Sequence, residues 1–200
     1  MTFTGAVGTA CTFPLRAIIA VCVALRIHPN VLTLTGVIIN AWAGWSLATG
    51  RFWLAGFIML LANIFDFIDG KVAEELNLSS RFGGFWDSVM DRFSDLFLLI
   101  GLIYLYATLE RPDYVLITAL TLMFSVMTSY TRARAESEIL QCKVGFMERP
   151  ERIVLFMIGA FTNRMAAVLW VILVLSVLTV LNRIYFTWLK LRPENDRALT

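Results

Sequence analysis

Six long runs of apolar residues dominate this 200-residue chain and leave only short segments between them. They cover residues 31–49, 52–68, 93–109, 114–131, 153–162 and 165–189. A helix of about 20 apolar residues can cross the roughly 30 Å hydrocarbon core of a bilayer. Charged residues make up only 16% of the chain, whereas soluble domains carry about 25%. The sequence therefore predicts an all-α integral membrane protein with six transmembrane helices, and it excludes a disordered chain or an ordinary water-soluble domain.

The first thirty residues differ from these spans because charged residues interrupt their apolar stretch. Residues 13–27 contain Arg16 and Arg26, and no basic residue precedes Arg16, as a cleaved signal peptide would require. We expect an amphipathic helix in the membrane interface, followed by a turn at Pro29 that leads into the first span. Residues 1–191 are expected to form one membrane domain, with residues 1–30 as the interfacial helix and turn. A polar tail follows at 192–200.

Basic residues in the short loops indicate the orientation of the chain. An even number of spans puts both termini on one side, and this side holds Arg16, Arg26, Arg81, Lys143, Arg149, Lys190, Arg192 and Arg197. The other side holds only Arg51, Arg111 and Arg164. Cytoplasmic loops carry the excess of Lys and Arg. We therefore expect a multi-pass protein of the cell (inner) membrane with cytoplasmic termini.

Five aspartates lie in or beside the apolar helices, where an ionisable group costs at least about 2.5 kcal/mol on insertion scales. They are Asp66, Asp69, Asp87, Asp91 and Asp95. Helical geometry puts Asp66 and Asp69 on one face, and Asp87 and Asp91 on one face of the next helix. Helices joined by a short loop pack antiparallel, so the two pairs can converge. Oxygen ligands of this kind predict Mg²⁺ or Mn²⁺, and two such ions suit a phosphoryl transfer.

Ion pairing with Arg81 and Arg92, or a proton pathway, is the alternative interpretation of these aspartates. The carboxylates outnumber the nearby cations, which favours the metal site. Asp95 continues the helix face of the preceding two aspartates, and we expect it to have a structural role.

The aspartates belong to a longer pattern with small residues. It reads Asp66-x-x-Asp69-Gly70-x-x-Ala73-Glu74, then eight residues, then Gly83-x-x-x-Asp87-x-x-x-Asp91. This resembles the D-x-x-D-G-x-x-A-R, eight-residue, G-x-x-x-D-x-x-x-D pattern of the CDP-alcohol phosphotransferase family. Every aspartate, small residue and spacing matches. One position departs, because the family has Arg where this chain has Glu74. Lys71 and Arg81 are the nearby cations that could replace its charge, and loss of activity is the alternative.

The resemblance implies an enzyme of phospholipid synthesis that transfers a phosphatidyl group from CDP-diacylglycerol to an alcohol and releases CMP. It implies metal ligation of two Mg²⁺ or Mn²⁺ ions by Asp66, Asp69, Asp87 and Asp91. Asp91 would also be the catalytic base for the acceptor hydroxyl. The CDP-lipid would bind at Thr33, Asp69, Gly70, Ala73 and Gly83. The resemblance further implies a homodimer with its active site facing the cytoplasm, and nothing in the sequence predicts a nucleic-acid partner.

Two basic segments bear on the identity of the acceptor alcohol. Arg132 and Arg134 end one helix, and Arg149 and Arg152 begin another. Arginine forms the better fork for phosphate, although a basic cytoplasmic rim alone would also satisfy the positive-inside rule. The segments are similar to those of the inositol-phosphate branch of the family. That similarity implies that the four arginines bind the phosphate of inositol phosphate, with glycerol 3-phosphate or serine as alternative acceptors.

Other classes of membrane protein also use intramembrane aspartates. An aspartate-rich prenyltransferase needs a second aspartate box far along the chain, and no such box follows Asp113. A transporter typically has broken helices and internal repeats, which we do not find. An inactive membrane binding protein stays open because of Glu74.

Overall fold

The computed structural model describes residues 15–192, and all regular structure within this range is helical. A short helix, Leu15–Ala24, precedes six longer ones. These are α2 (Pro29–Ala48), α3 (Phe52–Glu75), α4 (Arg81–Thr108), α5 (Pro112–Glu136), α6 (Arg149–Phe161) and α7 (Met165–Lys190). The all-α prediction is confirmed, and one helix forms at each apolar run. The predictions for residues 1–14 and 193–200 lie outside the described residues.

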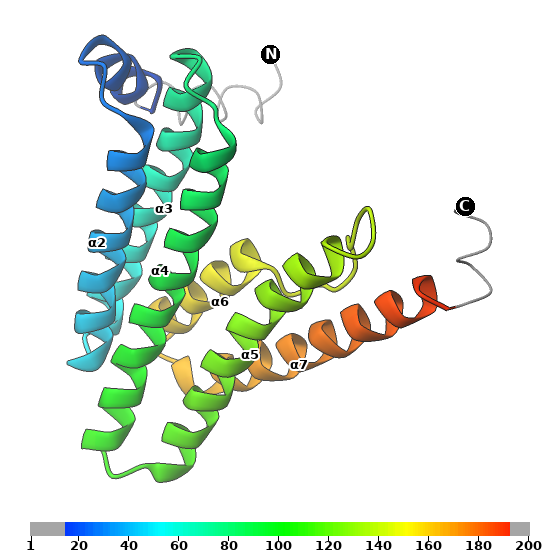
Figure 1. Cartoon of the computed structure of the whole chain (residues 1–200). Coiled ribbons are helices and arrows are strands. Elements are labelled where there is room, and N and C mark those ends of the chain that lie inside the picture. Colours follow the sequence, from blue (N-terminus) through cyan, green and yellow to red (C-terminus); the bar gives the residue numbers. More distant parts are fainter. Residues whose placement is uncertain (1–14, 193–200) are drawn as a thin grey trace, which may run out of the picture.

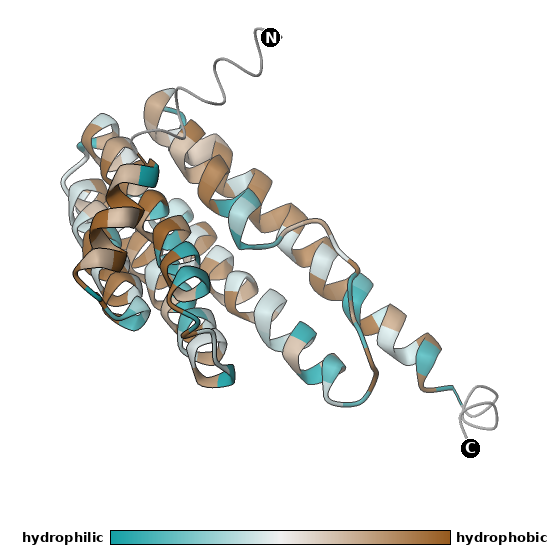
Figure 2. Ribbon diagram, turned by 90° about the horizontal axis from the view of Figure 1, so that it is seen from above, coloured by the Kyte–Doolittle hydropathy of each residue, from teal (hydrophilic) through white to brown (hydrophobic). Residues whose placement is uncertain are grey.

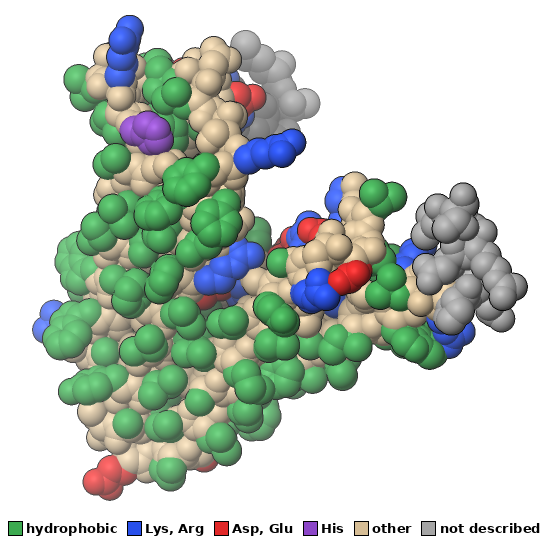
Figure 3. Space-filling model, viewed as in Figure 1, with side chains coloured by type: hydrophobic (Ala, Val, Ile, Leu, Met, Phe, Trp, Pro, Cys, Tyr) green, Lys and Arg blue, Asp and Glu red, His purple; other side chains and the backbone are tan. Residues whose placement is uncertain are grey.

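The helices form two groups that meet at an angle (Figure 1). In the first group, α2 packs against both α3 and α4. In the second group, α5 packs against α7, and α6 contacts both α3 and α7. Figure 1 shows α5 and α7 running away from the upright α2–α4 group. In the space-filling view, charged side chains gather in the hollow between the two groups, whereas apolar side chains cover most of the remaining visible surface (Figure 3).

Helix starts follow local capping chemistry. The Ser80 hydroxyl accepts a hydrogen bond from Gly83 N at 3.0 Å, so α4 begins at Arg81, well before the apolar run that starts at Phe93. The turn predicted at Pro29 is confirmed, because α2 begins at this residue and His28 Nδ1 caps it by accepting from Asn30 N. These early starts extend both helices beyond their apolar runs, and the start of α4 places Asp87 and Asp91 on helical backbone.

Four of the helices, α2, α3, α5 and α7, are long and apolar enough to cross a membrane. Helix α6 has 13 residues and is therefore only about 20 Å long. Helix α4 carries its charged residues in its first half, before the apolar stretch that starts at Leu96. Figure 2 shows the result along the chain: long hydrophobic stretches with hydrophilic residues concentrated near particular helix ends. The chain is thus an all-helical membrane protein with four candidate spans among its described residues.

Helices α2 and α4 approach each other closely at two glycines. A Cβ atom at Gly101 would lie 2.1 Å from the Gly44 carbonyl oxygen, and one at Gly44 would lie 2.4 Å from the Phe97 carbonyl oxygen. Small residues allow such backbone contact between membrane helices. This contact fixes α4, and with it the aspartates of its first half, against α2.

The short helix before α2 packs across the ends of α2 and α3. Its Ile19 and Cys22 are buried against Leu32 of α2 and against Ile68 and Val72 of α3. The side chains of Ile18 and Val21 in this helix, and of Leu25 directly after it, are exposed. The helix therefore has one apolar contact with the bundle and a second apolar surface outside it.

Candidate active site

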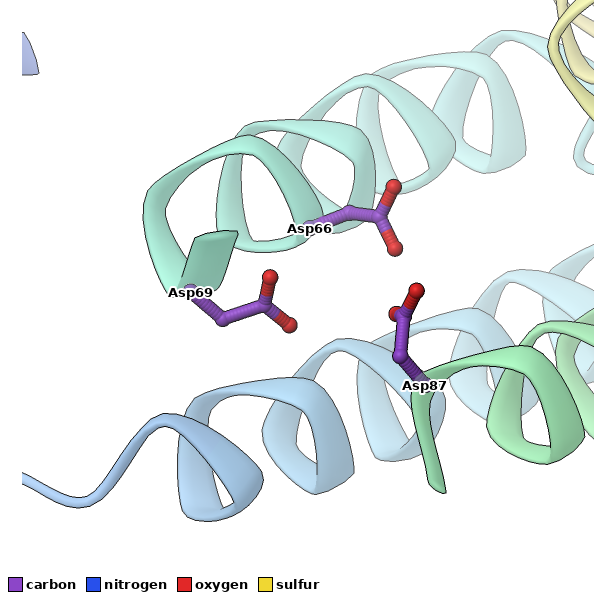
Figure 4. A group of neighbouring side chains, drawn as sticks. All are labelled: Asp66, Asp69 and Asp87. Atoms are coloured by element: carbon purple, nitrogen blue, oxygen red, sulfur yellow. The ribbon is translucent and has the colours of Figure 1, made fainter. Parts of the chain in front are cut away.

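Three aspartates converge where α3 ends and α4 begins. Asp66 and Asp69 come from α3 and Asp87 from α4, and each offers a carboxylate oxygen within 4.8 Å of the others. Figure 4 shows the three carboxylates turned toward one another across the space between the helices. The convergence predicted from helix spacing is therefore present for these three residues.

The carboxylate cluster is supported by α2. The Thr33 hydroxyl donates a hydrogen bond of 2.6 Å to Oδ2 of Asp69, and both residues are buried. A hydroxyl that donates to a carboxylate forms a strong, charge-assisted bond. Thr33 thus orients Asp69. The sequence analysis had predicted for Thr33 only a contact with the CDP-lipid.

The donor set of this cluster fits a hard divalent cation. All three ligand groups are carboxylates, which suit Mg²⁺ and Mn²⁺. Oxygens at the observed spacing can share one ion, because metal–oxygen distances are about 2.0–2.6 Å. Without a cation, three clustered carboxylates would repel one another. Asp66, Asp69 and Asp87 are therefore the residues that could hold the metal.

A cavity of about 270 Å³ opens beside Asp69 and Asp87. We call it the glycine cavity, because Gly70, Gly83 and Gly84 line it together with Ala73 and Thr33. A Cβ atom at Gly70 would meet nothing within 4 Å, so the absence of a side chain there leaves open space rather than tight helix packing. All the small residues of the sequence pattern line this one cavity.

The fourth aspartate of the pattern, Asp91, lies to one side of the three-carboxylate cluster. Arg149 at the start of α6 pairs with Asp91. Its Nη1 atom lies 2.8 Å from Oδ1 of Asp91 and 2.9 Å from Oδ2 of Asp66. One guanidinium thus joins two aspartates that the sequence pattern assigned to metal, and it links α6 to α3 and α4.

A second cavity, of about 220 Å³, adjoins Asp91. We call it the arginine cavity, because Arg92, Arg132, Arg149, Arg152 and Arg183 line it. These residues come from α4, α5, α6 and α7, so the cavity lies between the two helix groups. Three of the four arginines selected from the sequence are brought together here.

Arg152 is the most deeply buried of the selected arginines, with 2% of its surface exposed. Its Nε and Nη2 atoms both donate to Oδ2 of Asp95, at 3.1 and 2.5 Å. Its Nη1 atom donates to the Thr128 hydroxyl at 3.1 Å. This ion pair between Arg152 and Asp95 agrees with the structural role expected for Asp95. Arg152 also lines the arginine cavity.

Arg134 lies elsewhere. Its guanidinium donates to the Ser137 hydroxyl at 2.6 Å and pairs with Glu138 at 2.5 Å. It lines a different, mainly apolar groove between α5 and α7, with Tyr130 and Trp188. Arg134 therefore does not line the arginine cavity. It lies two residues after Arg132, so its side chain is on another face of α5.

Arg183 of α7 is a residue that the sequence reasoning missed. It is 2% exposed, its Nε donates to the Val144 carbonyl at 2.9 Å, and its Nη1 donates to the Thr128 carbonyl. The available signal was its position, since an arginine inside the longest apolar run is costly unless it faces polar partners.

Glu74, the departure from the family pattern, is not among the described residues that line either cavity. Its carboxylate pairs with Lys71 at 2.8 Å, and its side chain is 69% exposed. The reversed charge at this position is thus held in a surface ion pair.

Comparison with known proteins agrees with this geometry. The family model for CDP-alcohol phosphatidyltransferases matches residues 26–188. The chain is 35% identical to an archaetidylinositol phosphate synthase of Pyrococcus horikoshii, over 86% of this chain and 89% of the relative. It is 32% identical to a phosphatidylinositol phosphate synthase of Mycolicibacterium smegmatis, over 78% and 76% of the two chains.

Solved structures of the Mycobacterium tuberculosis phosphatidylinositol phosphate synthase have the same fold. The form with bound CDP-DAG gives a TM-score of 0.81 at 26% identity, over 87% of this chain and 93% of the other. The form with manganese and citrate also gives 0.81, at 28% identity, over 87% and 88%. The chain therefore belongs to the CDP-alcohol phosphatidyltransferase family, whose members are enzymes that transfer a phosphatidyl group from a CDP-linked lipid to an alcohol with the help of divalent metal ions.

Proposed function

We propose that this chain transfers the phosphatidyl group of CDP-diacylglycerol to a hydroxyl of inositol phosphate and releases CMP. The observation that carries the proposal is the meeting of two chemically different cavities at one group of aspartates. The glycine cavity includes Asp69 and Asp87, and the arginine cavity includes Asp91. A nucleotide-linked donor on one side and an anionic acceptor on the other would thus have their reacting groups at neighbouring carboxylates.

The glycine cavity is the proposed binding site for the CDP part of the donor. Gly70, Ala73 and Gly83 leave room for the nucleotide, and Thr33 holds Asp69 in place. The relative solved with bound CDP-DAG supports this assignment. Asp66, Asp69 and Asp87 would hold a divalent ion, and Asp91 would contribute to a second one. When bound, such ions neutralise the pyrophosphate and the charge that develops on departing CMP.

The arginine cavity is the proposed site for the acceptor phosphate. Arg132, Arg149, Arg152 and Arg183 line it, and guanidinium groups bind phosphate through paired N–H donors. Arg134 is left out of this set because it does not line the arginine cavity. Glycerol 3-phosphate would suit the same charges, but the names of the relatives favour an inositol phosphate. Serine carries no phosphate for these arginines to bind.

The transfer requires one bond to form and one to break at the lipid-side phosphorus. The acceptor hydroxyl oxygen bonds to this phosphorus, and the bond from the phosphorus to the CMP oxygen breaks with its electron pair going to CMP. Asp91 would take the hydroxyl proton, as a carboxylate within hydrogen-bond reach can. Arg149, 2.8 Å from Asp91, would fix the direction of that carboxylate.

We also propose that α4 and α6 complete a six-span membrane domain covering residues 1–191. The exposed apolar surface of Ile18, Val21 and Leu25 supports an interfacial position for the first helix. Basic residues near the site end of the helices favour a cytoplasmic active site. By resemblance to its family, we expect the chain to act as a homodimer.

An active enzyme is favoured over a non-catalytic membrane protein, despite Glu74. All four aspartates of the pattern are present, and three of them converge. Glu74 itself faces solvent in a pair with Lys71, so its negative charge is kept away from the proposed donor site.

The test is an acceptor panel with purified protein, CDP-diacylglycerol and Mn²⁺. Inositol phosphate, glycerol 3-phosphate, serine and inositol are supplied separately, and CMP release is measured for each. We expect CMP release with inositol phosphate well above the other three. Release only with glycerol 3-phosphate would refute the inositol assignment, and release only with serine or inositol would refute the phosphate site.

A further inference from the structure

A single carboxylate oxygen joins two arginines of the arginine cavity. Oε1 of Glu148 accepts a hydrogen bond from Nη1 of Arg132 at 2.8 Å and another from Nη2 of Arg183 at 3.2 Å. Arg132 belongs to α5 and Arg183 to α7, and Glu148 is the residue immediately before α6. One side chain thus connects three helices at the cavity wall.

The segment that carries Glu148 is fixed to α7. Met147 N donates to the Thr179 hydroxyl at 3.0 Å, and Arg183 Nε donates to the Val144 carbonyl. Gly145 has a positive φ of 95°, and a Cβ atom there would lie 2.4 Å from Thr179 Cγ2. The backbone leading to Glu148 is therefore closely packed, which gives its carboxylate a defined place.

We propose that Glu148 is a positioning residue that sets the arrangement of Arg132 and Arg183 for one acceptor phosphate. The inference rests on the proposed function of the arginine cavity. Glu148 does not touch the reacting atoms. It acts through the two arginines, which it holds at the distance and orientation that a phosphate requires.

The physical reason lies in the charges of the three groups. Two guanidinium groups that both reach the same oxygen atom are close enough to repel each other, and the buried position of Arg183 weakens the screening of this repulsion by water. The Glu148 carboxylate offsets this repulsion and orients both planes. Each guanidinium has five N–H donors, so the bridge leaves further donors for a ligand.

Glu148 also caps α6, and the experiment must separate the two roles. Its side chain and that of Glu151 form reciprocal hydrogen bonds with each other's backbone N–H groups. Glu151→Ala is therefore the matched control, because it removes the acceptor for Glu148 N from the same cap without touching the arginine bridge. Glu148→Gln removes the charge at constant length. Glu148→Asp keeps the charge and a good capping residue but shortens the reach to the arginines.

The measurement is steady-state kinetics with inositol phosphate, together with thermal unfolding of each variant. We expect both Glu148 variants to raise the acceptor KM, by about tenfold for Glu148→Asp, with kcat and the KM for CDP-diacylglycerol unchanged. Glu151→Ala should leave the acceptor KM at the wild-type value. The comparison of variants requires that the wild-type protein turns over inositol phosphate. A wild type without such turnover would refute the proposed function and, with it, the acceptor role of Glu148.

Two results would overturn the inference while leaving the proposed function intact. A lower acceptor KM in Glu148→Gln would mean that the carboxylate competes with phosphate for the arginines rather than positioning them. Equal rises of the acceptor KM in Glu148→Gln and Glu151→Ala, with parallel losses of thermal stability, would show that Glu148 acts only as a helix cap.

Discussion

Arg149 Nη1 lies 2.8 Å from Oδ1 of Asp91, and this ion pair joins the arginine cavity to the group of aspartates. The two residues come from α6 and α4, which belong to the two helix groups of the fold. The same nitrogen also contacts Asp66 of α3. The angle between the helix groups therefore determines how the proposed acceptor site meets the carboxylates.

Replacing Asp91 with Asn tests its role as base. The amide keeps the shape of the side chain but cannot accept the hydroxyl proton. Loss of a general base typically costs about 10²- to 10⁴-fold in rate. We expect kcat to fall on that scale while binding of CDP-diacylglycerol, measured by calorimetry, persists in part. Near-normal turnover in this variant would remove Asp91 from the mechanism.

Replacing Glu74 with Arg restores the family pattern at a solvent-facing position. Because Glu74 is 69% exposed in a surface pair with Lys71, we expect the variant to fold and to keep its activity or gain some. Glu75→Arg is the matched control for the added positive charge alone. A large loss of activity in Glu74→Arg but not in Glu75→Arg would show that Glu74 has a positive role.

Arg132 and Arg134 form a matched pair, because they lie two residues apart on one helix and only Arg132 lines the arginine cavity. A charge-assisted contact to phosphate contributes about 1.5–3 kcal/mol, or roughly 10- to 100-fold in affinity. Arg132→Gln should raise the KM for inositol phosphate on that scale, whereas Arg134→Gln should change it little. The donor KM should be unchanged in both. The reverse order of effects would contradict the assignment of the cavity.

Replacing Gly101 with Ala tests the close contact of α2 and α4. The new Cβ atom would clash with the Gly44 carbonyl, and such overpacking typically costs about 1–3 kcal/mol. This outweighs the gain in helix propensity, which is about 1 kcal/mol. We expect a lower thermal midpoint in detergent. Gly84→Ala, where the added atom meets nothing within 4 Å, should not lower the midpoint.

Much of the fold followed from the sequence because it depends on local patterns. Apolar runs located every long helix, and the spacing of Asp66, Asp69 and Asp87 on helix faces predicted their convergence. Helix ends were less predictable, since α4 starts at a Ser80 cap before its apolar run. A single sequence carries no signal for the angle between the two helix groups.

The arginines show where sequence reasoning stops. Arg132 and Arg134 are the same residue type and lie two positions apart in the sequence, yet helical geometry puts their side chains on different faces of α5. Arg183 lies within an apolar run. Its role was not predicted because its partners Thr128, Val144 and Glu148 lie far away in sequence. The exposure of Glu74 likewise could not be predicted without knowing how α3 packs against the other helices.

The central claim is that CMP release and lipid formation are one metal-dependent event at this group of aspartates. The most direct test quantifies both products, CMP and phosphatidylinositol phosphate, in the same reaction with CDP-diacylglycerol, inositol phosphate and Mn²⁺. We predict that the two form in equal amounts, and that neither forms with EDTA or in Asp69→Asn. CMP without the new lipid, or undiminished product in EDTA, would contradict this account.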